Sequence, residues 1–152
     1  MSTPSPPNPP DAALRSVHTS NLPGLFDQLR ISLLVSTYQA GKVILVRNDN
    51  GLLNTHFRPF TKPMGIAGGA ARLTIGGTNT VWEYRNVPAV TGTMEPPGKY
   101  DACYVPRRLH VTGDIDIHEM AYDHNSELWL INTRFCCLCT LDPDHSFSPR
   151  WR

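Results

Sequence analysis

The side chains best able to do chemistry lie together in one stretch, HVTGDIDIHEMAYDH, at residues 110–124. It holds three of the six histidines of the chain and four of its thirteen acidic residues: His110, His118, His124, Asp114, Asp116, Glu119 and Asp123. Imidazole and carboxylate groups bind divalent metals and carry protons near neutral pH. The stretch is therefore the first candidate for a metal or catalytic site.

Strand geometry selects a smaller set, because alternate side chains of a strand share a face at Cα separations of about 6.5 to 7 Å. The predicted metal ligands on that face are His110, Asp114, Asp116 and His118. If Gly113 interrupts the strand, the set shrinks to the three ligands that follow it. Oxygen ligands with one or two imidazoles suit Mn, Mg or ferrous Fe better than structural zinc. His118 and Glu119 are the candidate catalytic proton carriers.

A purely structural role for the same residues is the alternative. Asp side chains next to a strand commonly accept hydrogen bonds from backbone N–H groups of a turn. A histidine on a strand can equally bond across to a neighbouring element. On this interpretation the chain needs no cofactor, and both interpretations stay open.

A second candidate site is the pair Arg107 and Arg108, beside Tyr104. Two guanidinium groups next to an aromatic ring could bind an anion. The alternative is a solvated loop in which neither arginine has a specific partner.

The four cysteines fit neither a zinc site nor a disulfide framework. Cys136, Cys137 and Cys139 crowd into FCCLC, whereas Cys103 stands alone, and paired C-x-x-C knuckles are missing. If FCCLC begins a strand, Cys137 and Cys139 share one face and Cys136 takes the other. Free cysteine is among the most buried residue types, so we expect inert core thiols.

The elements that must position these residues read as short strands. NLPGLFDQLR, at residues 21–30, has helical spacing of apolar residues and predicts one short helix. The rest divides into three sets of strands separated by Gly, Asn, Asp and Pro turns. Their ranges are 31–60, 63–87 and 115–151.

The three sets repeat one pattern. LLVSTYQAGKVILV, LTIGGTNTVWEY and LWLINTRFCCLCTL each run apolar strand, Thr, short link and second strand. Thr37 and Thr78 are 41 residues apart, and Thr78 and Thr133 are 55 apart. Such spacing is typical of β-propeller blades, so the predicted fold is all-β, a partial propeller-like array of about three blades. A β-sandwich is the alternative. Residues 87–114 would form an elaborated loop between blades.

Length and composition limit the number of domains, the partners and the compartment that can be expected. A chain of 152 residues suits one domain, expected at 19–152, after a Pro-rich leader at 1–18 that is predicted to be disordered. A net charge of +1 argues against nucleic acid or an anionic membrane as partner. Without an apolar segment of membrane-spanning length or a secretory signal, the expected compartment is the cytoplasm.

Three strings carry a family resemblance: STYQAGKVILV, YVPRRLHVTGDIDIHEMA and LWLINTRFCCLCTLDPDHSF. They resemble a family of bacterial conserved hypothetical proteins, a domain of unknown function, over residues 20–152. The resemblance implies a WD40/YVTN-type propeller and members roughly twice this length, of which the chain matches the N-terminal half. A fragment of a longer protein is therefore expected. The resemblance supplies no catalytic residues.

Two classes of function follow. The first is a non-enzymatic propeller-type binding or interaction module for a protein or small molecule. The alternative is a metal-dependent hydrolase or lyase centred on Asp114, Asp116 and His118. A truncated gene product without activity of its own is a third interpretation.

Overall fold

The computed structural model describes residues 16–152. The predicted disordered leader at 1–18 therefore lies, except for its last three residues, outside the described part. The chain divides into two compact units, one made of the segment up to Val35 with Ile44–His56, the other of Ser36–Val43 with Phe57–Arg152.

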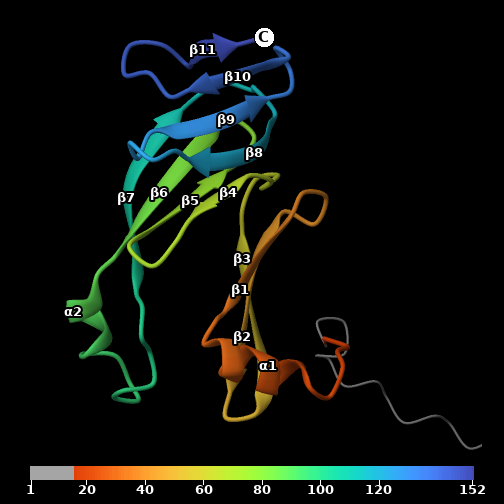
Figure 1. The fold of residues 1–152 in the computed structure, drawn as a ribbon, viewed down its shortest axis with the longest axis vertical. Coiled ribbons are helices and arrows are strands. Elements are labelled where there is room, and N and C mark those ends of the chain that lie inside the picture. Colours follow the sequence, from red (N-terminus) through yellow and green to blue (C-terminus); the bar gives the residue numbers. More distant parts are fainter. Residues whose placement is uncertain (1–15) are drawn as a thin grey trace, which may run out of the picture. The chain divides into compact units, whose positions relative to one another are not determined.

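The described residues form three antiparallel sheets, each built from strands that follow one another in sequence (Figure 1). The first sheet has the order β1 (Leu33–Thr37), β2 (Lys42–Asp49), β3 (Leu52–Pro59). The second has the order β4 (Ile66–Gly68), β5 (Arg72–Gly76), β6 (Thr80–Asn86), β7 (Tyr104–Val111). The third has the order β11 (Ser148–Trp151), β10 (Cys137–Thr140), β9 (Leu128–Asn132), β8 (Ile117–Tyr122). The all-β prediction with three successive sheets is confirmed.

The short helix predicted at 21–30 is also confirmed, as α1 (Leu22–Leu29). Pro23 stands in its first turn, where its missing N–H is not needed, and Pro23 and Phe26 are its buried residues. The helix ends at Arg30, which takes a left-handed backbone with φ of 52° and donates its N–H to the carbonyls of Asp27 and Phe26. A second helix, α2 (Pro88–Thr91), was not predicted.

The second and third sheets pack together with β4 and β5 against β8, and their facing side chains form one core. Val81, Leu130 and Cys139 are fully buried there. The close approach depends on Gly76, because a Cβ at that position would lie 3.0 Å from Cγ2 of Ile117. Figure 1 shows β4 and β8 side by side.

Polar contacts of Tyr122 also join the second and third sheets. The Tyr122 hydroxyl lies 2.6 Å from Oγ1 of Thr74, across the two sheets. The Arg72 guanidinium stacks over the Tyr122 ring, 3.5 Å from its centroid. One tyrosine of β8 thus contacts two residues of β5 through its ring and its hydroxyl.

The long loop predicted at residues 87–114, between two sets of strands, differs in the structure. Residues 104–111 form β7, the fourth strand of the second sheet, so the long connection covers 87–103 and joins β6 to β7 within that sheet. The prediction of a loop between blades is therefore wrong for this segment. The signal missed was YVPRRLHV, whose pairing with β6 tolerates Pro106 because β7 is an edge strand.

No described helix has the length and apolar character needed to cross a membrane.

Candidate functional site

The threonine repeat marks three turns that follow equivalent strands. Thr37 ends β1, Thr133 comes directly after β9, and Thr78 comes two residues after the end of β5. Thr37 closes its turn itself, since its hydroxyl donates to the Lys42 carbonyl at 2.8 Å and accepts the Lys42 N–H at 3.2 Å. The repeat found in the sequence therefore corresponds to three structurally equivalent turns.

The two connections that lead into the second and third sheets are each bonded to one of these turns. In the β3–β4 connection, the Thr61 carbonyl accepts the Thr78 N–H at 3.0 Å and the Thr78 hydroxyl at 3.2 Å. In the β7–β8 connection, the Asp116 carbonyl accepts the Thr133 N–H at 3.3 Å. The Phe60 N–H also donates to the Gly41 carbonyl of the first turn. These three turns and two connections are called the loop end below.

One small pocket of about 60 Å³ is lined by all five segments of the loop end, which belong to the same compact unit. The three turns contribute Tyr38, Thr78 and Arg134. The two connections contribute Lys62, Asp114 and Asp116. Two cationic and two anionic side chains therefore surround a space of a few water molecules.

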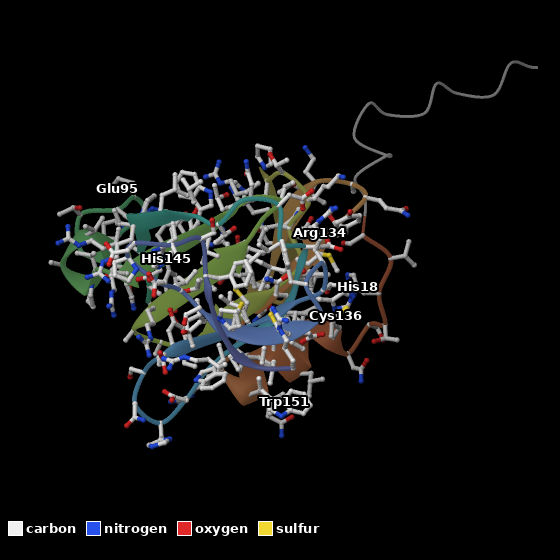
Figure 2. The ribbon with its side chains drawn as sticks, turned by 90° about the horizontal axis from the view of Figure 1, so that it is seen from above. His18, Glu95, Arg134, Cys136, His145 and Trp151 are labelled. Atoms are coloured by element: carbon white, nitrogen blue, oxygen red, sulfur yellow. The ribbon has the colours of Figure 1, made fainter. Side chains whose placement is uncertain are left out.

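Asp114 and Arg134 form the ion pair of this pocket. Arg134 Nη2 lies 2.8 Å from Asp114 Oδ2, and both side chains are half exposed. Figure 2 shows Arg134 in the same turn as Cys136. The pair fixes the direction of both side chains at the pocket rim.

Lys62 and Asp116 are the other two charges, and neither has an ion pair within residues 16–152. The Lys62 ammonium lies 5.5 Å from the centroid of the Tyr38 ring. Both residues have a left-handed backbone, with φ of 47° at Lys62 and 52° at Asp116. Non-glycine residues in that region carry a strain of about 1–3 kcal/mol and cluster at ligand-binding positions.

The predicted strand face through residues 110–118 is wrong. β7 ends at Val111 and β8 begins at Ile117, and the five residues between them form the β7–β8 connection. Gly113 with φ of 67° and Asp116 with φ of 52° turn the backbone twice. Strand alternation therefore does not apply to Asp114 and Asp116, which reach one pocket through a loop.

His110, the first predicted metal ligand, lies on β7 and bonds to another strand of its own sheet. Its Nε2 is 3.1 Å from Oε1 of Glu83 on β6. The two side chains are 30% and 14% exposed, so the contact is largely shielded from water. His110 thus bonds within its own sheet, whereas the structural alternative expected a bond to a neighbouring one.

His118 and Glu119, the predicted proton carriers, stand at the start of β8. His118 Nδ1 lies 3.9 Å from Glu119 Oε1, and the side chains are 56% and 71% exposed. Neither residue lines the pocket of the loop end. A catalytic role for the two stays a prediction.

The metal ligands predicted from the sequence do not all come together in the described chain. No group of three or more His, Cys, Asp and Glu side chains in residues 16–152 is placed to hold a metal ion. Of the four predicted ligands, Asp114 and Asp116 line one pocket, whereas His110 and His118 do not. A site for Mn, Mg or Fe stays a prediction, and it would need ligands in addition to Asp114 and Asp116.

The structural alternative for Asp114 and Asp116 was that their carboxylates cap backbone N–H groups, and this is not how the β7–β8 connection is held. Among the described residues, the Asp114 carboxylate accepts from the Arg134 guanidinium, and the backbone bonds are made by carbonyl groups of Ile115 and Asp116. Backbone capping by a carboxylate occurs instead at Asp123, whose Oδ1 accepts the N–H groups of Asn125 and Glu127, each at 2.9 Å. The backbone bond from Glu127 is the main reason that the pKa of Asp123 is lowered.

Arg107 and Arg108 lie on β7, where both are exposed, and neither lines the pocket. Arg108 stands opposite Glu83 in the pairing of β6 with β7. Tyr104 donates its hydroxyl to the Gly69 carbonyl at 2.9 Å, and burial followed by the Asp101 charge raises its pKa. Anion binding by the two arginines stays a prediction.

The cysteines match the core prediction in part. Cys137 and Cys139 are buried on one face of β10, and burial is the main cause that raises the pKa of Cys139 to about 11. Cys136 is exposed and lies in the turn before β10 with φ of 50°, so its prediction as a core thiol is wrong. All four cysteines are free thiols, with Cys103 half-buried.

Sequence reasoning missed Lys62, Tyr38 and Arg134 as members of a site. A usable signal was present, since Tyr38 and Arg134 each follow a threonine of the repeat. Lys62 stands directly before Pro63, where the second set of strands was predicted to begin. Only the fold brings these positions, 24 to 96 residues apart, to one pocket.

Comparison with known proteins gives one match. The model of the family described as a domain of unknown function, DUF4915, matches residues 20–152. Comparison with curated proteins and with solved structures gives no match. The expected kinship with an uncharacterised family is thereby confirmed, over the same residues on which the repeat, the three sheets and the loop end are built. The chain belongs to the DUF4915 family.

Proposed function

We propose that this chain is a propeller-type binding module that takes a small molecule at the loop end. The observation that carries the proposal is the pocket to which three equivalent turns and two connections all contribute. Turns and connections from several repeats of a scaffold that meet around one charged pocket are typical of a ligand site.

The propeller interpretation rests on how the second and third sheets are built. Each has four consecutive antiparallel strands, as a propeller blade does, and their first strands β4 and β8 pack side by side. The first strands of neighbouring blades lie next to each other around the axis of a propeller. The bacterial origin and cytoplasmic location expected from the sequence stay predictions beside this one.

Strain and charge favour binding over a purely structural role for the pocket. A left-handed Lys62 and a left-handed Asp116 both reduce stability, and glycine or asparagine would fit either backbone better. Unpaired charges at strained positions do not help the fold. They are explained if their side chains contact a ligand.

The alternative function is a metal-dependent hydrolase or lyase. It is favoured by Asp114 and Asp116, two carboxylates that share the pocket. Its test is calorimetric titration of the chain with Mn²⁺ and Mg²⁺, repeated with Asp116→Asn. Metal uptake that the variant abolishes would support the alternative and contradict a metal-free binding site.

The binding function is tested by NMR of the backbone amides with a panel of small amino acids, organic acids, amines and sugars. We expect shifts concentrated at Thr78 and Thr133, whose N–H groups bond to the two connections. Lys62→Gln should abolish them, whereas Arg85→Gln, a matched loss of charge on the exposed surface of β6 outside the pocket, should not. If no compound shifts these amides, the proposal is wrong.

A further inference from the structure

The four charges of the loop-end pocket fall into two kinds. Asp114 and Arg134 neutralise each other through their 2.8 Å contact. Lys62 and Asp116 form no ion pair with any described residue, although both line the same pocket. The pocket therefore offers one free positive and one free negative group.

The backbones at or beside Lys62 and Asp116 are bonded to the turns of the loop end. Asp116 is half-buried, and its carbonyl is bonded to the Thr133 N–H at 3.3 Å. Lys62 lies between Thr61, whose carbonyl is bonded to Thr78, and the buried Pro63. The Tyr38 ring lies 5.5 Å below the Lys62 ammonium and gives it a second fixed contact. The backbone bonds fix where the two side chains begin, and both side chains line the one pocket.

A ligand with a single charge would satisfy only half of this arrangement. An anion bound at Lys62 would be repelled by the Asp116 carboxylate. A cation bound at Asp116 would be repelled by the Lys62 ammonium. A molecule that carries both an ammonium and a carboxylate pairs with each group at once. Balanced charge in the pocket thus selects for balanced charge in the ligand.

The size of the pocket narrows the choice further. About 60 Å³ is room for roughly four to six water-sized atoms, since one water needs about 10–15 Å³ on this measure. Glycine and alanine have about this number of non-hydrogen atoms. Larger side chains would have to extend out of the pocket.

We propose that the loop-end pocket binds a small zwitterion, an α-amino acid, with its carboxylate on Lys62 and its ammonium on Asp116. This inference rests on the proposed binding function and gives its ligand a chemical class. The Asp114–Arg134 pair at the rim orients the connection and the turn but leaves the two binding charges free.

The test is titration of the whole chain with glycine and alanine, and with acetate and methylammonium as matched single ions, followed by backbone-amide NMR. We expect the amino acids to bind at least ten-fold more tightly than either ion, with shifts at Thr78 and Thr133. Lys62→Gln and Asp116→Asn should each weaken glycine binding at least ten-fold. Arg85→Gln should leave it unchanged, because Arg85 lies on the exposed surface of β6 outside the pocket. Asparagine tolerates the left-handed backbone, so Asp116→Asn should retain the wild-type spectrum elsewhere.

Several results would overturn the inference. Acetate or methylammonium could bind as tightly as glycine, or Asp116→Asn could leave glycine binding intact. A double-mutant cycle on the ligand-free chain could also show that Lys62 and Asp116 are coupled, which would mean that they pair with each other. A sugar or amine that binds at the same amides would refute the amino acid and retain the binding function. Absence of any ligand at these amides would refute both.

Discussion

Arg134 reaches from the β9–β10 turn to the carboxylate of Asp114 in the β7–β8 connection, with 2.8 Å between Nη2 and Oδ2. The pair spans 20 residues of sequence and joins two segments of the loop end. Because both side chains are half exposed, solvent screens the attraction, and exposed pairs typically contribute about 0.2–1 kcal/mol. The contact therefore orients side chains more than it stabilises the fold.

Arg134→Ala should consequently change the free energy of unfolding by less than about 1 kcal/mol. Denaturant unfolding followed by fluorescence measures the change, and Arg107→Ala on the exposed surface of β7 is the matched control. A loss several times larger than that of the control would show that the ion pair is a structural element after all.

Leu130→Ala should destabilise the chain by about 2–5 kcal/mol, because Leu130 is fully buried between the second and third sheets and alanine leaves a cavity. Its neighbour Ile131 is 40% exposed and points to the other face of β9, so Ile131→Ala should cost clearly less. Urea unfolding of the two variants provides the comparison. Equal losses would be inconsistent with the packing of these two sheets.

Gly76→Ala should also be destabilising, by roughly 1–3 kcal/mol, because the added methyl would meet Cγ2 and Cβ of Ile117 at 3.0 and 3.3 Å. Gly24→Ala in α1 is the control, since no heavy atom lies within 4 Å of its new Cβ and alanine favours the helix. Thermal unfolding should show a lower midpoint for the first variant. A neutral Gly76→Ala would mean that β5 and β8 can separate at little cost.

Thiol labelling of the folded chain should detect one fast cysteine, Cys136, and two very slow ones, Cys137 and Cys139. Exposure makes Cys136 accessible, whereas burial and a pKa of about 11 keep the Cys139 thiol protonated and unreactive. Cys136→Ser should remove the fast phase without altering the slow ones. Rapid modification of either strand cysteine before unfolding would argue against the observed core.

Acid should weaken the fold through Asp123 and Asp142, whose pKa values are lowered. The largest cause at Asp123 is the Glu127 N–H, and at Asp142 the Asp144 N–H. A lowered pKa means that the stabilisation is fully present above the ordinary value of 3.8 and is lost as pH falls through the folded-state value below it.

Urea midpoints measured between about pH 5 and pH 2 test this sign. Asp142→Asn keeps an oxygen acceptor for the Asp144 N–H but cannot titrate, so its midpoint should fall less steeply in acid than that of the wild type. Asp101→Asn, a change at an exposed carboxylate of the β6–β7 connection, is the control. Parallel curves for Asp142→Asn and the wild type would contradict the assignment.

Periodic features of the sequence predicted the architecture well. Each of the three sets combines apolar strands, turn residues and a threonine at the same place (Thr37, Thr78 and Thr133). Three sheets of consecutive strands could therefore be predicted from the sequence. The close packing of β4 and β5 on β8 was not predictable, because it depends on where Gly76 meets Ile117 in space. Local patterns determine strands, and contacts distant in sequence determine how they pack.

Single backbone angles account for most of the errors at the site. A left-handed Asp116 and Gly113 ended the strand expected through His110 and His118, and a left-handed Cys136 removed that cysteine from the core. Asp is enriched in this conformation but adopts others far more often, and Cys has no such preference, so neither residue type predicts it at a given position. Asp114 and Asp116, which the sequence singled out as metal ligands, are two members of a pocket whose other charges come from distant loops.

The long β6–β7 connection gives the molecule a place where its chain can be altered by design. Residues 87–103 are largely exposed and join two strands already paired along Thr80–Asn86, and Figure 2 shows Glu95 far from Arg134 of the loop end. Exposed connections of this kind tolerate insertions best. A fluorophore, an affinity handle or a fused reporter domain placed near Glu95 would therefore monitor the protein without obstructing the pocket.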